Sequence, residues 1–236
     1  MEKIKRYLKE WKWYELLFLF IALTTLITLS ILFNSNIIDL LTSILTIIMC
    51  LLLTKGKFTG HIVGIIATIL YVISSTFVGY YGEVIISIVL MLPMGVWALI
   101  SWLKNRRNDK EQGKVVIIKK VKTIELIILF LSQIIMFIGY YFLLKAFNTQ
   151  FLIMSTLSVS VSFIGTYLLI RRSDLNWLIW IFNSFIIISL WLYMTVIDLS
   201  YITLTVMSFF LLINNIYGYI NWQVLKKRQN FSVNKS

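Results

Sequence analysis

The stretch that decides the fold of this chain opens with Asn176-Trp177-Leu178-Ile179-Trp180-Ile181-Phe182-Asn183 and closes with Ile213-Asn214-Asn215-Ile216-Tyr217-Gly218-Tyr219-Ile220-Asn221-Trp222. Between these ends lie two apolar spans that meet at Asp198-Leu199-Ser200. Each span has about 23 residues, enough to cross a hydrocarbon core of about 30 Å as a helix. Both spans carry uncharged amides, which are costly in lipid without a partner. Amides at membrane depth beside Trp and Tyr therefore predict a site for a flat, polar solute.

The composition of the whole chain agrees with this membrane interpretation. Of the 236 residues, 59% are hydrophobic and 14% are charged, whereas a soluble domain has about 45–50% apolar and about 25% charged residues. Apolar runs recur along the whole length, so we predict an all-α polytopic membrane protein with eight transmembrane helices. The predicted spans are 14–33, 37–54, 58–78, 83–103, 123–145, 150–170, 175–197 and 200–222.

The Lys and Arg residues follow the alternation of the predicted loops. If the N-terminus lies inside the cell, all of the 22 positive residues except Lys145 fall in inner segments. An excess of Lys and Arg in cytoplasmic loops is the usual topology signal, so both termini are predicted to be cytoplasmic. The net charge of +12 is then explained by anionic lipid headgroups of the bilayer, without nucleic acid as a partner.

Loop lengths divide the spans into two groups of three around a single linker helix. Residues 1–36 hold a basic segment and a peripheral helix, and residues 37–103 form a first three-helix repeat. Residues 104–149 form a basic cytoplasmic loop and the linker helix, residues 150–222 form a second repeat, and residues 223–236 form a basic cytoplasmic tail. Two parallel three-helix repeats around a linker are typical of a class of transporters.

The motif pattern of the last third resembles that of a known family. Asn176-Trp177-x-x-Trp180-x-x-Asn183, an aromatic-rich span and then Asn215-x-Tyr217-Gly218-Tyr219-x-x-Trp222 with a basic tail resemble the Pnu family of bacterial vitamin transporters, which includes the PnuC-type nicotinamide riboside transporters. The resemblance implies a fold similar in outline to SWEET sugar transporters, a place in the bacterial inner membrane and a homotrimer. It also implies facilitated diffusion of a small-molecule substrate that is trapped by phosphorylation inside the cell.

The substrate within the family is left open by one departure from its pattern. The W-x-x-N element of the family matches Trp180 and Asn183, but Gly64 and Ala67 occupy the corresponding places in the first repeat. Members of the family carry nicotinamide riboside, thiamine, riboflavin or deoxynucleosides. Nicotinamide riboside is the first expectation for this chain, and the other compounds are alternatives.

The candidate substrate-binding residues are amides and aromatic side chains within the spans. Trp180 and Asn183 are three residues apart and share a helix face. An Asn side chain offers two donors and an acceptor, and a Trp face can stack on a nicotinamide ring. The alternative is interhelical hydrogen bonding, which contributes about 0.6 kcal/mol on average. The full candidate set is Trp180, Asn183, Asn214, Asn215, Tyr217, Trp97 and Gln133; Asn214 and Asn215 point about 100° apart, so one of the two is expected to face the site.

The sequence lacks the residues that several classes of function require. No Asp, Glu, Lys or Arg falls in the middle third of any predicted span, although an intramembrane charge is the usual mark of a proton or ion pathway. The chain also has no Walker A motif, no H-E-x-x-H and no Cys/His cluster, so we expect no enzyme activity, metal or cofactor. Two alternatives remain: the substrate-binding membrane subunit of an ATP-driven vitamin importer, and an intramembrane enzyme or structural membrane protein.

Overall fold

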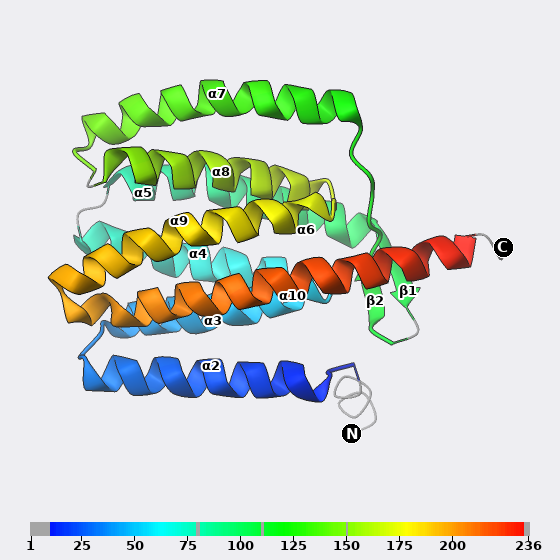
Figure 1. Ribbon diagram of the computed structural model, residues 1–236, viewed down its shortest axis with the longest axis horizontal. Coiled ribbons are helices and arrows are strands. Elements are labelled where there is room, and N and C mark those ends of the chain that lie inside the picture. Colours follow the sequence, from blue (N-terminus) through cyan, green and yellow to red (C-terminus); the bar gives the residue numbers. More distant parts are fainter. Residues whose placement is uncertain (1–9, 79–80, 110, 150, 234–236) are drawn as a thin grey trace.

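A computed structural model describes residues 10–78, 81–109, 111–149 and 151–233, and these residues form a bundle of long helices (Figure 1). Seven helical segments in the described part are long and apolar enough to cross a membrane, and α4 contains a shorter apolar segment, Thr59–Ile73. The first nine residues of the predicted basic segment lie outside the described residues. The helices are α2 (Trp13–Leu32), α3 (Ile37–Thr54), α4 (Thr59–Val78), α5 (Tyr81–Ile86), α6 (Leu92–Lys104), α7 (Thr123–Ala146), α8 (Leu152–Ile170), α9 (Leu175–Ile197) and α10 (Ile202–Val233).

The ends and irregularities of the helices follow local chemistry. The side chain of Asn36 accepts a hydrogen bond of 2.9 Å from the backbone N–H of Ile38 and so caps the start of α3. Gly56 has φ of +69° just after α3, a conformation that glycine adopts without strain. A π-helical turn, Ser87–Met91, separates α5 from α6. Pro93, which has no N–H to donate, is the second residue of α6 and follows that turn after Leu92.

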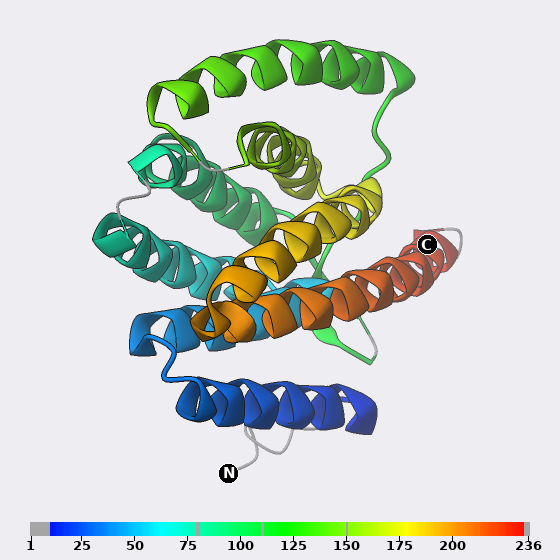
Figure 2. The same ribbon diagram turned by 60° about the vertical axis from the view of Figure 1, so that its left-hand side comes forward.

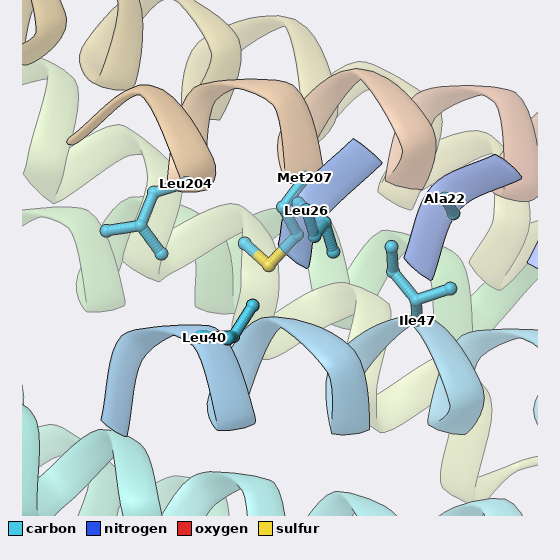
Figure 3. Packing of buried hydrophobic residues seen from close by; sticks show 6 residues of the cluster. All are labelled: Ala22, Leu26, Leu40, Ile47, Leu204 and Met207. Atoms are coloured by element: carbon cyan, nitrogen blue, oxygen red, sulfur yellow. The ribbon is translucent and has the colours of Figure 1, made fainter. Parts of the chain in front are cut away.

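Two helices lie at opposite edges of the bundle, with the others between them. Figures 1 and 2 show α2 along one edge and α7 along the other. Helix α2 packs on α3 and α10 through a buried apolar cluster, and α7 packs on α8. Figure 3 shows this cluster, in which each of three helices supplies two side chains: Ala22 and Leu26 from α2, Leu40 and Ile47 from α3, and Leu204 and Met207 from α10.

The basic segment after α6 folds into a β-hairpin that the sequence analysis did not predict. Strands β1 (Arg106–Asp109) and β2 (Gly113–Val116) are antiparallel. The backbone N–H of Val116 donates to Gly56 O over 3.0 Å, and that of Lys119 donates to Arg172 O over 3.0 Å. The hairpin is therefore bonded to the α3–α4 loop, and the segment that follows it is bonded to the α8–α9 loop. We call this end of the bundle the hairpin end.

The last helix is longer than its predicted span. Residues 200–222 were predicted as the span and residues 223–236 as a tail, but α10 continues past Trp222 as far as Val233. Figure 1 shows this extension beside β1 and β2. Gln229, near its end, donates a 2.8 Å hydrogen bond to Val116 O and accepts one of 2.9 Å from Ile118 N. The C-terminal extension of α10 therefore packs against the hairpin.

Substituting Gly218 with alanine should destabilise the bundle, because α10 and α9 approach closely at this residue. A Cβ atom at Gly218 would lie 2.5 Å from Trp177 Cε3, a ring buried in the core. Overpacking of this kind costs about 1–3 kcal/mol. Gly139 is the matched control, since a Cβ there meets nothing within 4 Å. Thermal unfolding in detergent should give a lower melting temperature for Gly218→Ala and no loss for Gly139→Ala; equal losses would contradict the close approach.

Candidate functional site

A cavity of about 490 Å³ lies among six helical segments of the bundle. Its described lining residues come from α3, α4, the α5–α6 segment, α8, α9 and α10, with Thr149 and Phe151 from the α7–α8 connection. None of the lining residues belongs to α2 or α7, the two edge helices. Pockets for small molecules typically have about 300–1,000 Å³, so the cavity has the size of such a site.

The described wall of the cavity is largely apolar, and its polar side chains include no Asp, Glu, Lys or Arg. These polar side chains carry hydroxyls, amides, indole N–H groups, one thiol and one imidazole. Small hydroxyl side chains are densest on α8, where Ser155, Ser158, Ser162 and Thr166 all line the cavity. Their spacing of three and four residues places them on one helix face. The sequence analysis missed this stripe, although its helical period was available as a signal.

Trp180 and Asn215 are the two predicted site residues that line the cavity. The Nδ2 atom of Asn215 donates to Ser184 Oγ over 3.0 Å and to Trp180 O over 3.4 Å. Both bonds use the amide nitrogen, so the amide oxygen is the atom that can accept from a solute. The Trp180 ring lies against Gly165 of α8, where a Cβ would be 3.0 Å from Trp180 Cε2. Because Gly165 has no side chain, the Trp180 ring can pack directly against α8.

Asn183 lies one contact behind the cavity wall. It is fully buried, is not among the lining residues, and donates a 3.0 Å hydrogen bond from Nδ2 to Ser162 Oγ. Ser162 itself lines the cavity. Asn183 thus bonds to a hydroxyl of the wall and does not itself line the cavity.

Asn214 and Tyr217 connect α10 to other helices outside the cavity lining. The Nδ2 atom of Asn214 donates to Thr54 Oγ1 over 3.2 Å. The hydroxyl of Tyr217 donates to Glu15 Oε1 over 2.6 Å and so joins α10 to α2. Of the two neighbouring asparagines, Asn215 lines the cavity and Asn214 does not, as expected for adjacent residues on a helix.

Trp97 and Gln133 also lie outside the cavity lining. Trp97 is on α6 and is 60% exposed on the surface of the bundle. The Nε2 atom of Gln133 on α7 donates to Ser160 Oγ over 2.9 Å and so connects α7 to α8. Trp97 is therefore a surface residue, and Gln133 contacts a neighbouring helix.

Three further polar residues line the hairpin end of the cavity: His61, Asn176 and Trp177. His61 comes from the start of α4, and the other two come from the start of α9. The sequence analysis did not place them in the site, because their sequence positions near span ends are equally typical of membrane-interface residues. Only the convergence of α4 and α9 brings them to one cavity.

A network of buried ion pairs lies at the hairpin end, outside the cavity lining. Lys55 Nζ is 2.5 Å from Glu15 Oε2, and the exposures of the two side chains are 1% and 0%. Burial lowers the pKa of Lys55 below its ordinary value, and the Glu15 carboxylate opposes that shift. Lys57 pairs with Glu10 over 2.6 Å and also donates to Gln112 O in the hairpin. The network thus fixes the start of α2, the α3–α4 loop and the hairpin to one another.

Comparison with known proteins adds two findings to this geometry. A sequence profile of the family described as nicotinamide mononucleotide transporter matches residues 36–224. The crystal structure of the vitamin B3 transporter PnuC is similar, with a TM-score of 0.79 and 21% sequence identity over 94% of this chain and 98% of that chain. At this identity the structural similarity supports the fold. No curated protein sequence matches the chain.

Proposed function

Because the chain belongs to the nicotinamide mononucleotide transporter family, we propose that it takes up a vitamin-like nucleoside, nicotinamide riboside, by facilitated diffusion through the cavity. The structural neighbour is described as a vitamin B3 transporter, and nicotinamide riboside carries a nicotinamide base. The family match agrees with the resemblance to the Pnu family found in the motifs around Trp180 and Asn215.

The observation that carries this proposal is the uncharged wall of the cavity. A nucleotide brings a phosphate anion, and a dry site that binds phosphate normally supplies Arg or Lys donors. Without such a partner, the desolvation of the phosphate would be costly. No Lys or Arg lines the cavity in the part of the chain that the structure describes. A nucleoside, which offers hydroxyls and a carboxamide, suits this wall better than its phosphorylated form.

Named side chains of the wall match the parts of the nucleoside. The Trp180 ring offers a face for the nicotinamide ring, and the positive charge of that ring adds a cation–π attraction of about 0.5–2 kcal/mol. The amide oxygen of Asn215 and the hydroxyl of Ser184 can bind the carboxamide. Asn183 holds the Ser162 hydroxyl in place. Among the described residues, no carboxylate lines the cavity to couple proton movement to transport, so passive movement followed by phosphorylation inside the cell is the simplest mechanism.

The eight-span topology is also part of the proposal. Six of the spans would enclose the cavity as two groups of three, in the SWEET-like layout, with α7 as the linker and α2 peripheral. The hairpin end, which carries the Lys and Arg residues of the loops, would face the cytoplasm of a bacterium, with both termini on that side of the inner membrane. A homotrimer is proposed from the family resemblance.

Transport by the purified chain alone is the direct test. Proteoliposomes preloaded with unlabelled nicotinamide riboside should accumulate the labelled compound from outside without ATP or an ion gradient. Unlabelled nicotinamide riboside should compete, and nicotinamide mononucleotide should not. Asn215→Leu, which removes the amide from the wall, should abolish accumulation. Equal competition by the mononucleotide would contradict the argument from the uncharged wall.

The same assay separates the alternatives. Competition by thiamine, riboflavin or a deoxynucleoside instead of nicotinamide riboside would assign a different substrate within the family. Binding of a vitamin without accumulation of the labelled compound in the preloaded proteoliposomes would favour the membrane subunit of an ATP-driven importer. That subunit needs a partner ATPase to move its substrate.

A further inference from the structure

The hairpin end of the cavity holds three buried polar atoms that have no hydrogen-bond partner among the described residues. They are His61 Nε2, Asn176 Oδ1 and Trp177 Nε1, and their side chains are 5%, 0% and 2% exposed. All three residues line the cavity. The fourth lining residue with such an atom, Thr42, lies toward the opposite end, near the start of α3. Buried polar groups are nearly always paired, so three unpaired groups in residues of one cavity wall indicate a position for a polar ligand group.

A chain of ring contacts connects His61 to Trp177 at the hairpin end of the cavity. His61 packs edge-to-face on Trp102 with their ring centroids 4.4 Å apart. Trp222 bridges the rings of Trp102 and Trp177, with centroid distances of 5.6 Å and 5.7 Å. Asn176 directly precedes Trp177. This aromatic packing fixes the three polar side chains around the same end of the cavity.

The unpaired atoms have a distinct hydrogen-bonding character. Trp177 Nε1 only donates, Asn176 Oδ1 only accepts, and Nε2 of a neutral imidazole does either according to its tautomer. A ligand group that meets all three must both donate and accept, as a hydroxyl does. A phosphate or carboxylate only accepts, and a hydrocarbon ring does neither. The carboxamide of the nucleoside, which also donates and accepts, is already assigned to Asn215 and Ser184, so the cluster matches the neighbouring hydroxyls of the sugar.

We propose that His61, Asn176 and Trp177 form a sugar-binding subsite that holds the ribose hydroxyls of the transported nucleoside at the hairpin end. This inference rests on the proposed function and adds an orientation to it. Asn176 and Trp180 are four residues apart on α9, a rise of about 6 Å. A nucleoside with its base on Trp180 thus reaches the cluster with its ribose. The sugar points toward the hairpin and the base toward the opposite end.

The first test compares ribosides that lack one hydroxyl in the wild-type protein and in His61→Phe, which keeps an aromatic ring against Trp102. In the wild type, at least one of the 2′-, 3′- and 5′-deoxy analogues should bind roughly 5- to 100-fold more weakly than nicotinamide riboside, because a polar partner is left unpaired. In His61→Phe the ratio for that analogue should fall toward one. A purely structural role of His61 would weaken all the compounds alike and leave the ratio unchanged, which would overturn the subsite.

The second test needs no substitution, because His61 is the only histidine of the chain. Its imidazole nitrogens should give the only histidine signals in a spectrum of the ¹⁵N-His-labelled protein. These signals should shift when nicotinamide riboside is added, and nicotinamide, which has the base without the sugar, should leave them in place. Equal shifts with both compounds would overturn the orientation. If the wild-type protein does not bind nicotinamide riboside at all, the proposed function is wrong. If it binds the riboside and the histidine signals do not shift, only the subsite is wrong.

Discussion

Lys55→Met should lower the free energy of unfolding by about 3–5 kcal/mol, the largest loss that we expect from a single substitution in this chain. Methionine matches the length of the lysine stem but removes the charge that faces Glu15 over 2.5 Å. Both side chains are almost fully buried, so the Glu15 carboxylate would remain without its cation. Thermal or denaturant unfolding in detergent measures the loss.

Two further variants show whether burial of the charge is the cause. Adding Glu15→Gln to Lys55→Met removes the unpaired carboxylate, so the double variant should regain part of the lost stability. Glu111 pairs with Arg228 over 2.7 Å at the surface, where the exposures are 56% and 31%. Breaking that pair with Glu111→Gln should cost no more than about 1 kcal/mol. Equal losses from the buried and the surface pair would contradict the argument.

Trp180→Ala should weaken the binding of nicotinamide riboside by roughly 5- to 100-fold, since stacking of a base on an aromatic side chain contributes about 1–3 kcal/mol. Trp180 lines the cavity and its ring lies against Gly165. The dissociation constant can be measured by calorimetry on the purified protein. Phe182→Ala is the control, because Phe182 lies on the same helix but is 53% exposed and does not line the cavity.

Gly165→Ala tests the position of the Trp180 ring without removing it. The added Cβ would lie 3.0 Å from Trp180 Cε2, so the ring must move by a few tenths of an ångström. We expect a smaller loss of affinity than for Trp180→Ala, with the protein still folded. Unchanged affinity in both variants would place the base elsewhere in the cavity.

The helical spans could be predicted because hydropathy and charge act locally along the chain. Long apolar runs and the basic residues of the loops located the helices within a few residues, apart from the C-terminal end of α10, and the motif around Trp180 indicated the family. The hairpin could not be predicted in this way. Its strands have four residues each, and Val115 and Val116 are buried only because the α3–α4 loop and α10 cover them.

The wall of the cavity could be predicted only in part, because an intramembrane amide can either line a binding site or form a hydrogen bond within the bundle. Asn183, Asn214 and Asn215 are alike in sequence, yet one supports a wall hydroxyl, one bonds to Thr54 and one lines the cavity. Which purpose applies depends on the rotation of each helix against its neighbours. The α8 stripe from Ser155 to Thr166 was a stronger signal for the wall, since its helical period fixes a shared face.

Two backbone hydrogen bonds, one in the hairpin and one just after it, have a mechanical consequence. Val116 is bonded to the α3–α4 loop and Lys119 to the α8–α9 loop, so one short segment ties the two loops together. Helices α4 and α9 follow these loops and both line the cavity. At the hairpin end, the starts of the two helices can separate only if this segment detaches from at least one of its two loops.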